Sequence, residues 1–160
     1  INHYLNNLEV EANNHISSNW VKKIELVDLN DNSIDCIKDS NFLMLDIYFH
    51  KPFSLEMYDI GFFLVNRDGL NITAVSTSFK SDYKFDSLFL SKIRFKLNNL
   101  YLVDGDYYIN ISITRKFGGR IEFIPNAKKI QIIHSDFYSS GFKLNSRFGD
   151  IAVKFDVYGS

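Results

Sequence analysis

The stretch LVDGDYYINISI, residues 102–113, alternates apolar and polar side chains along its second half. Its isoleucines have one parity and its small polar residues the other: Ile109, Ile111 and Ile113 against Asn110 and Ser112. Because successive side chains of a strand point to opposite faces, this period of two predicts a β-strand with one buried face. The adjacent tyrosines fall on opposite faces, so Tyr107 is predicted to point inward and Tyr108 outward.

The entry to this strand has the pattern Leu-x-x-Gly-x-Tyr, formed by Leu102, Gly105 and Tyr107. This pattern resembles a tyrosine corner, in which the phenol packs inside a sandwich and its hydroxyl bonds to backbone a few residues upstream. We therefore expect a structural role for Tyr107.

The same alternation recurs along most of the chain. Of the 160 residues, 46% are hydrophobic and 16% aromatic, which is enough for one domain with a core and favours strands. The predicted strands are 22–29, 42–50, 59–66, 71–77, 91–98, 106–115, 128–134 and 150–158. About eight short strands predict an all-β fold, an antiparallel β-sandwich of immunoglobulin-like or jelly-roll-like type. We expect residues 1–20 to be the end of a helix plus a linker, and residues 21–160 to form the sandwich.

Two connections can be predicted from turn residues. NRDG, residues 66–69, should form a tight hairpin turn in which Gly69 takes a positive φ. KFGGR (116–120) and FIPN (123–126) should form a longer loop.

Charge and cysteine content restrict the partners. The formal net charge of −1, from 18 basic and 19 acidic residues, argues against electrostatic binding of nucleic acid or of an anionic membrane. The single cysteine, Cys36, excludes an intrachain disulfide and fits a reducing compartment. No apolar run reaches the length of a membrane helix.

Motifs for catalysis or metal binding are missing from the sequence. There is no Gly-rich phosphate loop, nucleophile elbow or zinc-type Cys/His spacing. The four histidines are scattered, and each is expected to be a surface or edge residue: His3, His15, His50 and His134. DLNDNSID (28–35) places Asp28, Asn30 and Asn32 at calcium-loop spacing, but Ser33 replaces the required glycine, so a hairpin rich in turn-forming residues is the better interpretation. We expect no cofactor and no metal.

The two outer faces of the predicted sandwich differ in charge. One would expose a charged, solvated set: Met44, Asp46, Tyr48, His50, Lys92, Arg94, Lys96 and Asn98. The other would expose an uncharged set: Phe63, Val65, Thr73, Val75, Thr77, Tyr108, Asn110, Ser112, Thr114 and Ile133. Aromatic rings among hydroxyls and carboxamides suit a sugar, whose C–H faces stack on rings while its hydroxyls form hydrogen bonds. The alternative is a subunit interface, or coverage by a terminal strand.

Two sets of residues are therefore candidates for glycan binding. The first lies on the uncharged face: Phe63, Thr73, Thr77, Tyr108, Asn110 and Ser112. The second lies in the loops: Phe79, Tyr83, Phe85, Arg115 and Arg120.

Taken in order, several pieces of the chain resemble one known family. They are KKIELVDLNDNS, LMLDIYFH, DIGFFLVNRDGLNITAVSTSF, LYLVDGDYYINISI and IQIIHSDFYSSGF followed by FGDIAVKF. Their order is similar to that of the C-terminal carbohydrate-binding domain of Wzt-type ATP-binding subunits in bacterial O-antigen ABC transporters. The shared positions are Gly61, Phe62, Leu64, Gly69, Ser76, Thr77, Leu102, Gly105, Tyr107 and Gly149. One departure is Val157-Tyr158, where related domains often carry a tryptophan.

The resemblance implies a fold, an assembly and a function. It implies an immunoglobulin-like homodimer, often formed by exchange of C-terminal strands, on the cytoplasmic side of the bacterial inner membrane. Such a domain recognises the lipid-linked O-antigen polysaccharide, usually at its non-reducing end, before export through a membrane permease. ATP hydrolysis would belong to a nucleotide-binding domain, whose last helix the N-terminal INHYL resembles. Ligand residues vary within the family, so none is carried over.

Two alternatives to glycan recognition remain open. One is a structural sandwich that uses the uncharged face to oligomerise. The other is an enzyme, but a glycosidase needs two carboxylates across a cleft, and Asp104 and Asp106 sit at a strand entrance as turn residues. We expect a non-catalytic domain, dimeric through the strand in FGDIAVKFDVY, which needs an edge to pair with.

Overall fold

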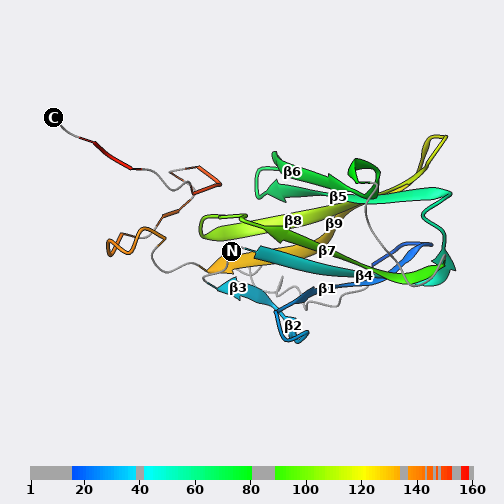
Figure 1. Ribbon diagram of the computed structural model, residues 1–160, viewed down its shortest axis with the longest axis horizontal. Coiled ribbons are helices and arrows are strands. Elements are labelled where there is room, and N and C mark those ends of the chain that lie inside the picture. Colours follow the sequence, from blue (N-terminus) through cyan, green and yellow to red (C-terminus); the bar gives the residue numbers. More distant parts are fainter. Residues whose placement is uncertain are drawn as a thin grey trace, which may run out of the picture.

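Two β-sheets face each other in the computed structural model (Figure 1), which describes residues 16–38, 42–80, 89–133, 137–142, 144–145, 147, 149–152 and 156–158. Sheet A has the order β2-β1-β4-β7 and sheet B the order β3-β9-β8-β5-β6. The strands of sheet A are β1 (Val21–Val27), β2 (Ser33–Ile34), β4 (Phe42–Phe53) and β7 (Leu90–Asn98). Those of sheet B are β3 (Cys36–Lys38), β5 (Tyr58–Asn66), β6 (Asn71–Ser76), β8 (Gly105–Arg115) and β9 (Arg120–Ile133). A 3-10 turn, η1 (Thr77–Phe79), follows β6.

The predicted all-β sandwich is confirmed, with two corrections. The short strand β3 runs parallel to β9, so sheet B is mixed, although all its other pairings are antiparallel. β9 begins at Arg120, so the predicted loop at 123–126 is wrong and only the residues around Phe117 form a turn. The turn at 66–69 is confirmed, because Gly69 has φ 79° and its N–H donates to the carbonyl of Asn66.

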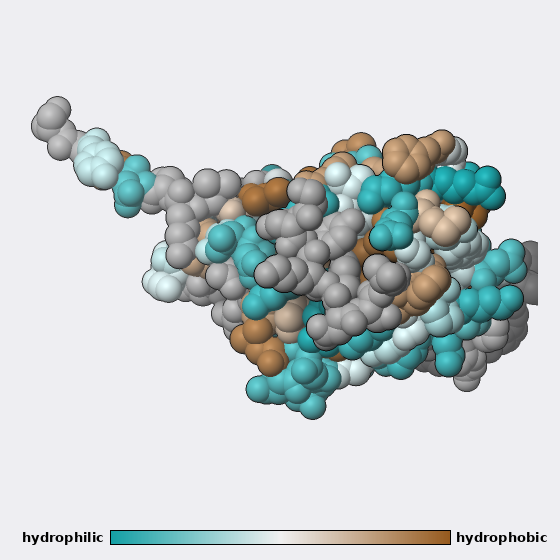
Figure 2. Space-filling model, turned by 45° about the vertical axis from the view of Figure 1, so that its right-hand side comes forward, coloured by the Kyte–Doolittle hydropathy of each residue, from teal (hydrophilic) through white to brown (hydrophobic). Residues whose placement is uncertain are grey.

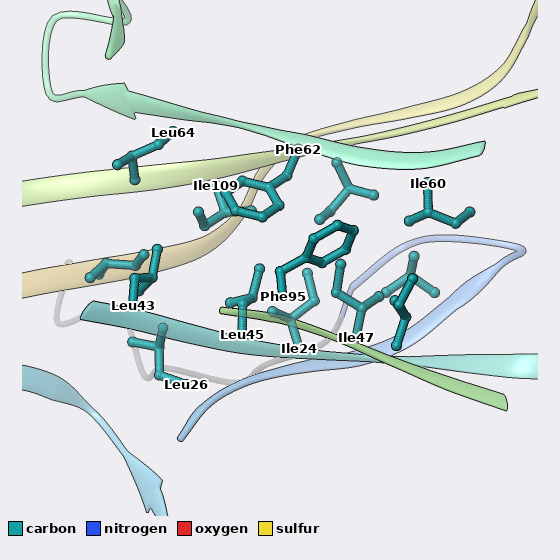
Figure 3. Close-up of a cluster of buried hydrophobic side chains, with 14 of the residues drawn as sticks. Ile24, Leu26, Leu43, Leu45, Ile47, Ile60, Phe62, Leu64, Phe95 and Ile109 are labelled. Carbon is teal, nitrogen blue, oxygen red and sulfur yellow. The ribbon is translucent and has the colours of Figure 1, made fainter. Parts of the chain in front are cut away.

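The core lies between the sheets and is built from the inward-pointing side chains of both. Figure 3 shows inward side chains from both sheets meeting there: Ile24, Leu26, Leu43, Leu45 and Ile47 from sheet A, and Ile60, Phe62, Leu64 and Ile109 from sheet B. Phe62 meets Phe95 edge to face across this layer, with ring centroids 5.4 Å apart. Each such side chain contributes about 1.5–3 kcal/mol on burial before conformational entropy is subtracted.

The tyrosine corner is also confirmed. Tyr107 is buried, and its hydroxyl lies 3.0 Å from the carbonyl oxygen of Val103 and 3.3 Å from that of Asp150. Burial, and then the nearby carboxylates of Asp150 and Asp104, raise the pKa of Tyr107 well above its usual value. The phenol therefore stays protonated and joins the entry of β8 to the C-terminal segment.

The predicted strand at 150–158 is not seen in the described part of the C-terminal segment. Ile151 forms an isolated antiparallel bridge with Leu102, and residues 156–158 are not in a strand. Residues 153–155 lie outside the described residues. Val157 and Tyr158 are 82% and 91% exposed.

Candidate functional site

The outer face of sheet A carries a charge network that is bonded internally. Asp46, predicted to be exposed, is buried, and Met44 beside it is buried too. The Asp46 carboxylate accepts hydrogen bonds from Arg94 Nε at 2.6 Å, Arg94 Nη2 at 2.8 Å and Lys92 Nζ at 3.3 Å. Burial opposes ionisation of Asp46, but the Arg94 hydrogen bond and the charges of Lys92 and Arg94 outweigh it and hold its pKa below the usual value. Because these charged groups are paired with one another, this face offers few free hydrogen-bonding groups to a ligand.

The outer face of sheet B is organised by β8, which lies between β5 and β9. Register places Ser112 opposite Gly61 on one side and Phe123 on the other. Residues that are opposite each other in a sheet project from the same face. Ser112 and Phe123 therefore share this face, as do Asn110 and its partner Phe63.

An aromatic pair and a guanidinium meet on this face. The rings of Phe63 and Phe123 have centroids 6.4 Å apart at 63°, and Arg120 Cζ lies 4.9 Å from the Phe123 centroid. Thr114 is opposite Arg120. We call these five residues the outer-face cluster: Phe63, Ser112, Thr114, Arg120 and Phe123. It combines ring faces, two hydroxyls and a cation.

A bulge in β9 sets the position of this cluster. Ile109 is opposite Lys128 but Ile111 is opposite Ile124, so three residues of β9 face one residue of β8. Within the bulge Asn126 has φ 48°, and its N–H donates to Asn110 Oδ1 at 2.7 Å. Asn110 is predicted to bind glycan, but its side-chain oxygen Oδ1 already accepts the hydrogen bond that holds the bulge.

The prediction that this face is uncharged is wrong. Tyr108 is opposite Lys129, whose ammonium pairs with Asp106 at 2.8 Å, and Arg120 adds a further cation. The hydrogen bond with Asp106 raises the pKa of Lys129. Tyr108 itself is half-buried beside this ion pair and keeps its outward position.

Two of the predicted residues do not face outward. Thr77 is only 5% exposed, and its hydroxyl donates to Asp59 Oδ1 at 3.0 Å while accepting from the N–H of Ile60 at 3.1 Å. Thr73 is opposite Leu64, an inward residue. The reason is a register irregularity between Leu64 and Val65, which moves Thr73 and Val75 out of the predicted phase.

The second set of candidate glycan-binding residues, those in the loops, has one described member in the outer-face cluster. Arg120 belongs to the outer-face cluster, while Arg115 and the 69%-exposed Phe79 lie at the same end of sheet B. Tyr83 and Phe85 lie outside the described residues. The β8–β9 turn also presents Phe117, which is 96% exposed.

Phe123 is the residue that sequence reasoning missed. FIPN (123–126) contains Pro125 and Asn126, both typical of turns, so the sequence predicts a loop at Phe123. The one signal for a strand here is the apolar-polar-apolar order of Ile121, Glu122 and Phe123, which is too short to decide against a loop.

The described residues hold no candidate metal centre. No group of three or more His, Cys, Asp or Glu side chains among them could hold a metal ion. Asp28 instead accepts from the N–H groups of Asn30 and Asn32, at 2.8 and 2.9 Å, as expected for a turn. No helix in the described part of the chain is long and apolar enough to cross a membrane.

The comparisons with known proteins match this chain by structure and not by sequence. No family model and no curated protein matches the sequence. A solved structure, described as the crystal structure of the C-terminal domain of Wzt, superposes with a TM-score of 0.60. The fold is that of the Wzt C-terminal domain. The match covers 91% of this chain and 87% of the Wzt domain at 13% sequence identity. It therefore establishes the fold and not the ligand.

Proposed function

We propose that this chain is a non-catalytic carbohydrate-binding domain that recognises a lipid-linked O-antigen polysaccharide for export by an ABC transporter. The observation that carries the proposal is the aromatic pair Phe63–Phe123 beside the hydroxyls of Ser112 and Thr114 on one sheet face. The Wzt-like fold and the resemblance of the ordered sequence pieces supply the transporter context.

The cluster suits a sugar ring laid flat on the sheet. Phe123 is 39% exposed and can stack on the C–H face of a sugar, and the neighbouring hydroxyls can donate to and accept from its hydroxyl groups. One stack and two or three hydrogen bonds leave only a few kcal/mol after ordering costs. We expect binding of a short glycan in the micromolar to millimolar range, stronger on a long chain that reaches two sites.

The carboxylates of this face do not suit glycoside hydrolysis. Asp59 is opposite Thr114 and accepts a hydrogen bond from Thr77, while Asp106 pairs with Lys129. Residues 106 and 114 lie eight positions apart on β8, about 26 Å along a strand. A glycosidase needs its two carboxyl groups within about 9.5 Å.

The proposed assembly is a homodimer formed by the C-terminal segment, which would pair as a strand with the partner. The exposed Val157 and Tyr158 support it, because an extended apolar segment gains by pairing with a partner edge. The further proposed partners are a nucleotide-binding domain of the full-length chain and a membrane permease, at the cytoplasmic side of the bacterial inner membrane. Nucleic acid is not among them.

A matched pair of phenylalanine variants tests the proposal. The assay is isothermal titration with O-polysaccharide purified from the bacterium that encodes the chain. Phe123→Ala should lower affinity about three- to tenfold through loss of the stack. Phe117→Ala, on the same hairpin but 96% exposed at its tip, should leave affinity unchanged. Absence of wild-type binding, or unchanged affinity of Phe123→Ala, would contradict the proposal.

A further inference from the structure

The charges of this nearly neutral chain are unevenly distributed along the sandwich. Figure 1 shows the β8–β9 hairpin and the β5–β6 hairpin at opposite ends. Among the described residues, the β8–β9 end carries mainly cations, Lys22, Lys51, Lys80, Arg115, Lys116 and Arg120, against Glu56, Asp59 and Glu122. In the part of the chain that the structure describes, the β5–β6 end carries seven carboxylates, Asp28, Asp31, Asp35, Asp68, Asp104, Asp106 and Asp150, against the cations Lys38, Arg67, Lys129 and Arg147. The net charge of −1 conceals this polarity.

Arg120 connects the cationic end to the outer-face cluster. Its guanidinium is held over the ring of Phe123, which in turn meets Phe63. Among the described residues Arg120 has no carboxylate partner, whereas Lys129 on the same face is neutralised by Asp106. Arg120 is therefore a positioned cation whose charge remains available to a ligand.

We propose that the outer-face cluster binds an acidic glycan, with a sugar carboxylate on Arg120 and the sugar ring on Phe123. This inference rests on the proposed function and specifies its substrate class. A guanidinium is planar and presents paired N–H donors, so it matches a carboxylate in a bidentate arrangement. Stacking on Phe123 limits the freedom of the guanidinium, so less entropy is lost when the carboxylate binds.

An anionic lipid surface is the competing partner for the cationic end, because Phe117 is so exposed. Two features favour the sugar. Arg120 lies on the sheet face together with Phe123, and the Lys116 ammonium near the tip donates to the carbonyl of Leu55 at 3.2 Å. In Figure 2, which turns this end forward, the coloured apolar residues form separate groups among hydrophilic ones.

Carboxyl reduction of the ligand tests the inference. The probe is a panel of immobilised bacterial acidic polysaccharides, each paired with its carbodiimide-reduced, neutral form. The wild-type chain should bind an acidic member roughly ten- to a hundredfold more tightly than its reduced form, and less tightly as salt rises. Arg120→Gln should abolish this preference, and Arg120→Lys should retain part of it. Arg67→Gln, an exposed arginine at the opposite end, is the matched control and should keep it.

Each contrary result has a separate meaning. Equal binding of both forms, or a preference that survives Arg120→Gln, overturns the acidic-glycan inference and leaves the proposed function standing. Binding to no polysaccharide in the panel, with the O-polysaccharide of the titration still bound, overturns the acidic-glycan inference alone, and binding to neither overturns both. Sedimentation with phosphatidylglycerol vesicles that is lost in Arg120→Gln, without glycan binding, would assign the cationic end to a membrane and overturn the inference.

Discussion

Arg94→Met is predicted to destabilise the domain by leaving a buried carboxylate poorly compensated. The Asp46 side chain is 2% exposed and receives two hydrogen bonds from Arg94, at 2.6 and 2.8 Å, and one from Lys92 at 3.3 Å. The substitution removes the two shorter bonds and keeps the hydrophobic stem. Asp46 then remains buried in the sheet with a single, longer ammonium contact.

The size of the effect follows from this partial compensation. Removing one partner of a fully buried ion pair costs about 3–5 kcal/mol. Because Lys92 remains and Arg94 is itself a third exposed, we expect the free energy of unfolding to fall by about 2–3 kcal/mol at pH 7. Asp46 has a folded-state pKa below its unfolded value of about 3.9, so its contribution is present above that pH and is lost as pH falls through the folded pKa. The difference between wild type and variant should therefore shrink below about pH 4.

Urea denaturation followed by circular dichroism at pH 7 and pH 3.5 measures both effects. Lys96→Met is the control, since Lys96 lies on the same strand and face, opposite Met44, and should change stability by less than about 0.5 kcal/mol. Replacing both partners in Asp46→Leu/Arg94→Met should recover most of the loss, because no buried charge remains. A loss below about 0.5 kcal/mol in Arg94→Met, or one equal at both pH values, would refute the reasoning.

Three further predictions concern the corner, the bulge and the C-terminus. Tyr107→Phe should lower the free energy of unfolding by about 1–2 kcal/mol in urea denaturation, because the carbonyl of Val103 loses its buried donor; a neutral result would deny the corner a structural role. Asn110→Ala should cost about 0.5–1.5 kcal/mol and speed hydrogen exchange of the Asn126 amide, which loses its acceptor; an unchanged exchange rate would contradict this. Deleting residues 148–160 should give monomer or aggregate in light scattering, and a well-behaved dimer would exclude strand exchange.

Sequence reasoning succeeded where one strong period decided the outcome. Seven of the predicted strands overlap named strands, and the corner at Tyr107 was recognisable because its pattern is local. The short strands β2 and β3 were missed because two or three residues carry no period. Face assignment failed at Thr77, where the chain leaves the strand for a 3-10 turn, and at Asp46, where cations on the next strand permit burial. These outcomes depend on partners distant in sequence.

The position of the outer-face cluster depends on the bulge in β9, whose residues Pro125 and Asn126 predict a loop from the sequence. If the register of Ile109 with Lys128 continued without a bulge, Phe123 would be opposite Thr114. The two extra residues move Phe123 two positions along β8, roughly 7 Å, to a place opposite Ser112. That shift brings its ring to the row beside Phe63, and it leaves the parity of the strand unchanged. Asn110 thus supports the proposed site by holding the bulge, so its substitution should weaken glycan binding through the position of Phe123 even if Asn110 never contacts the sugar.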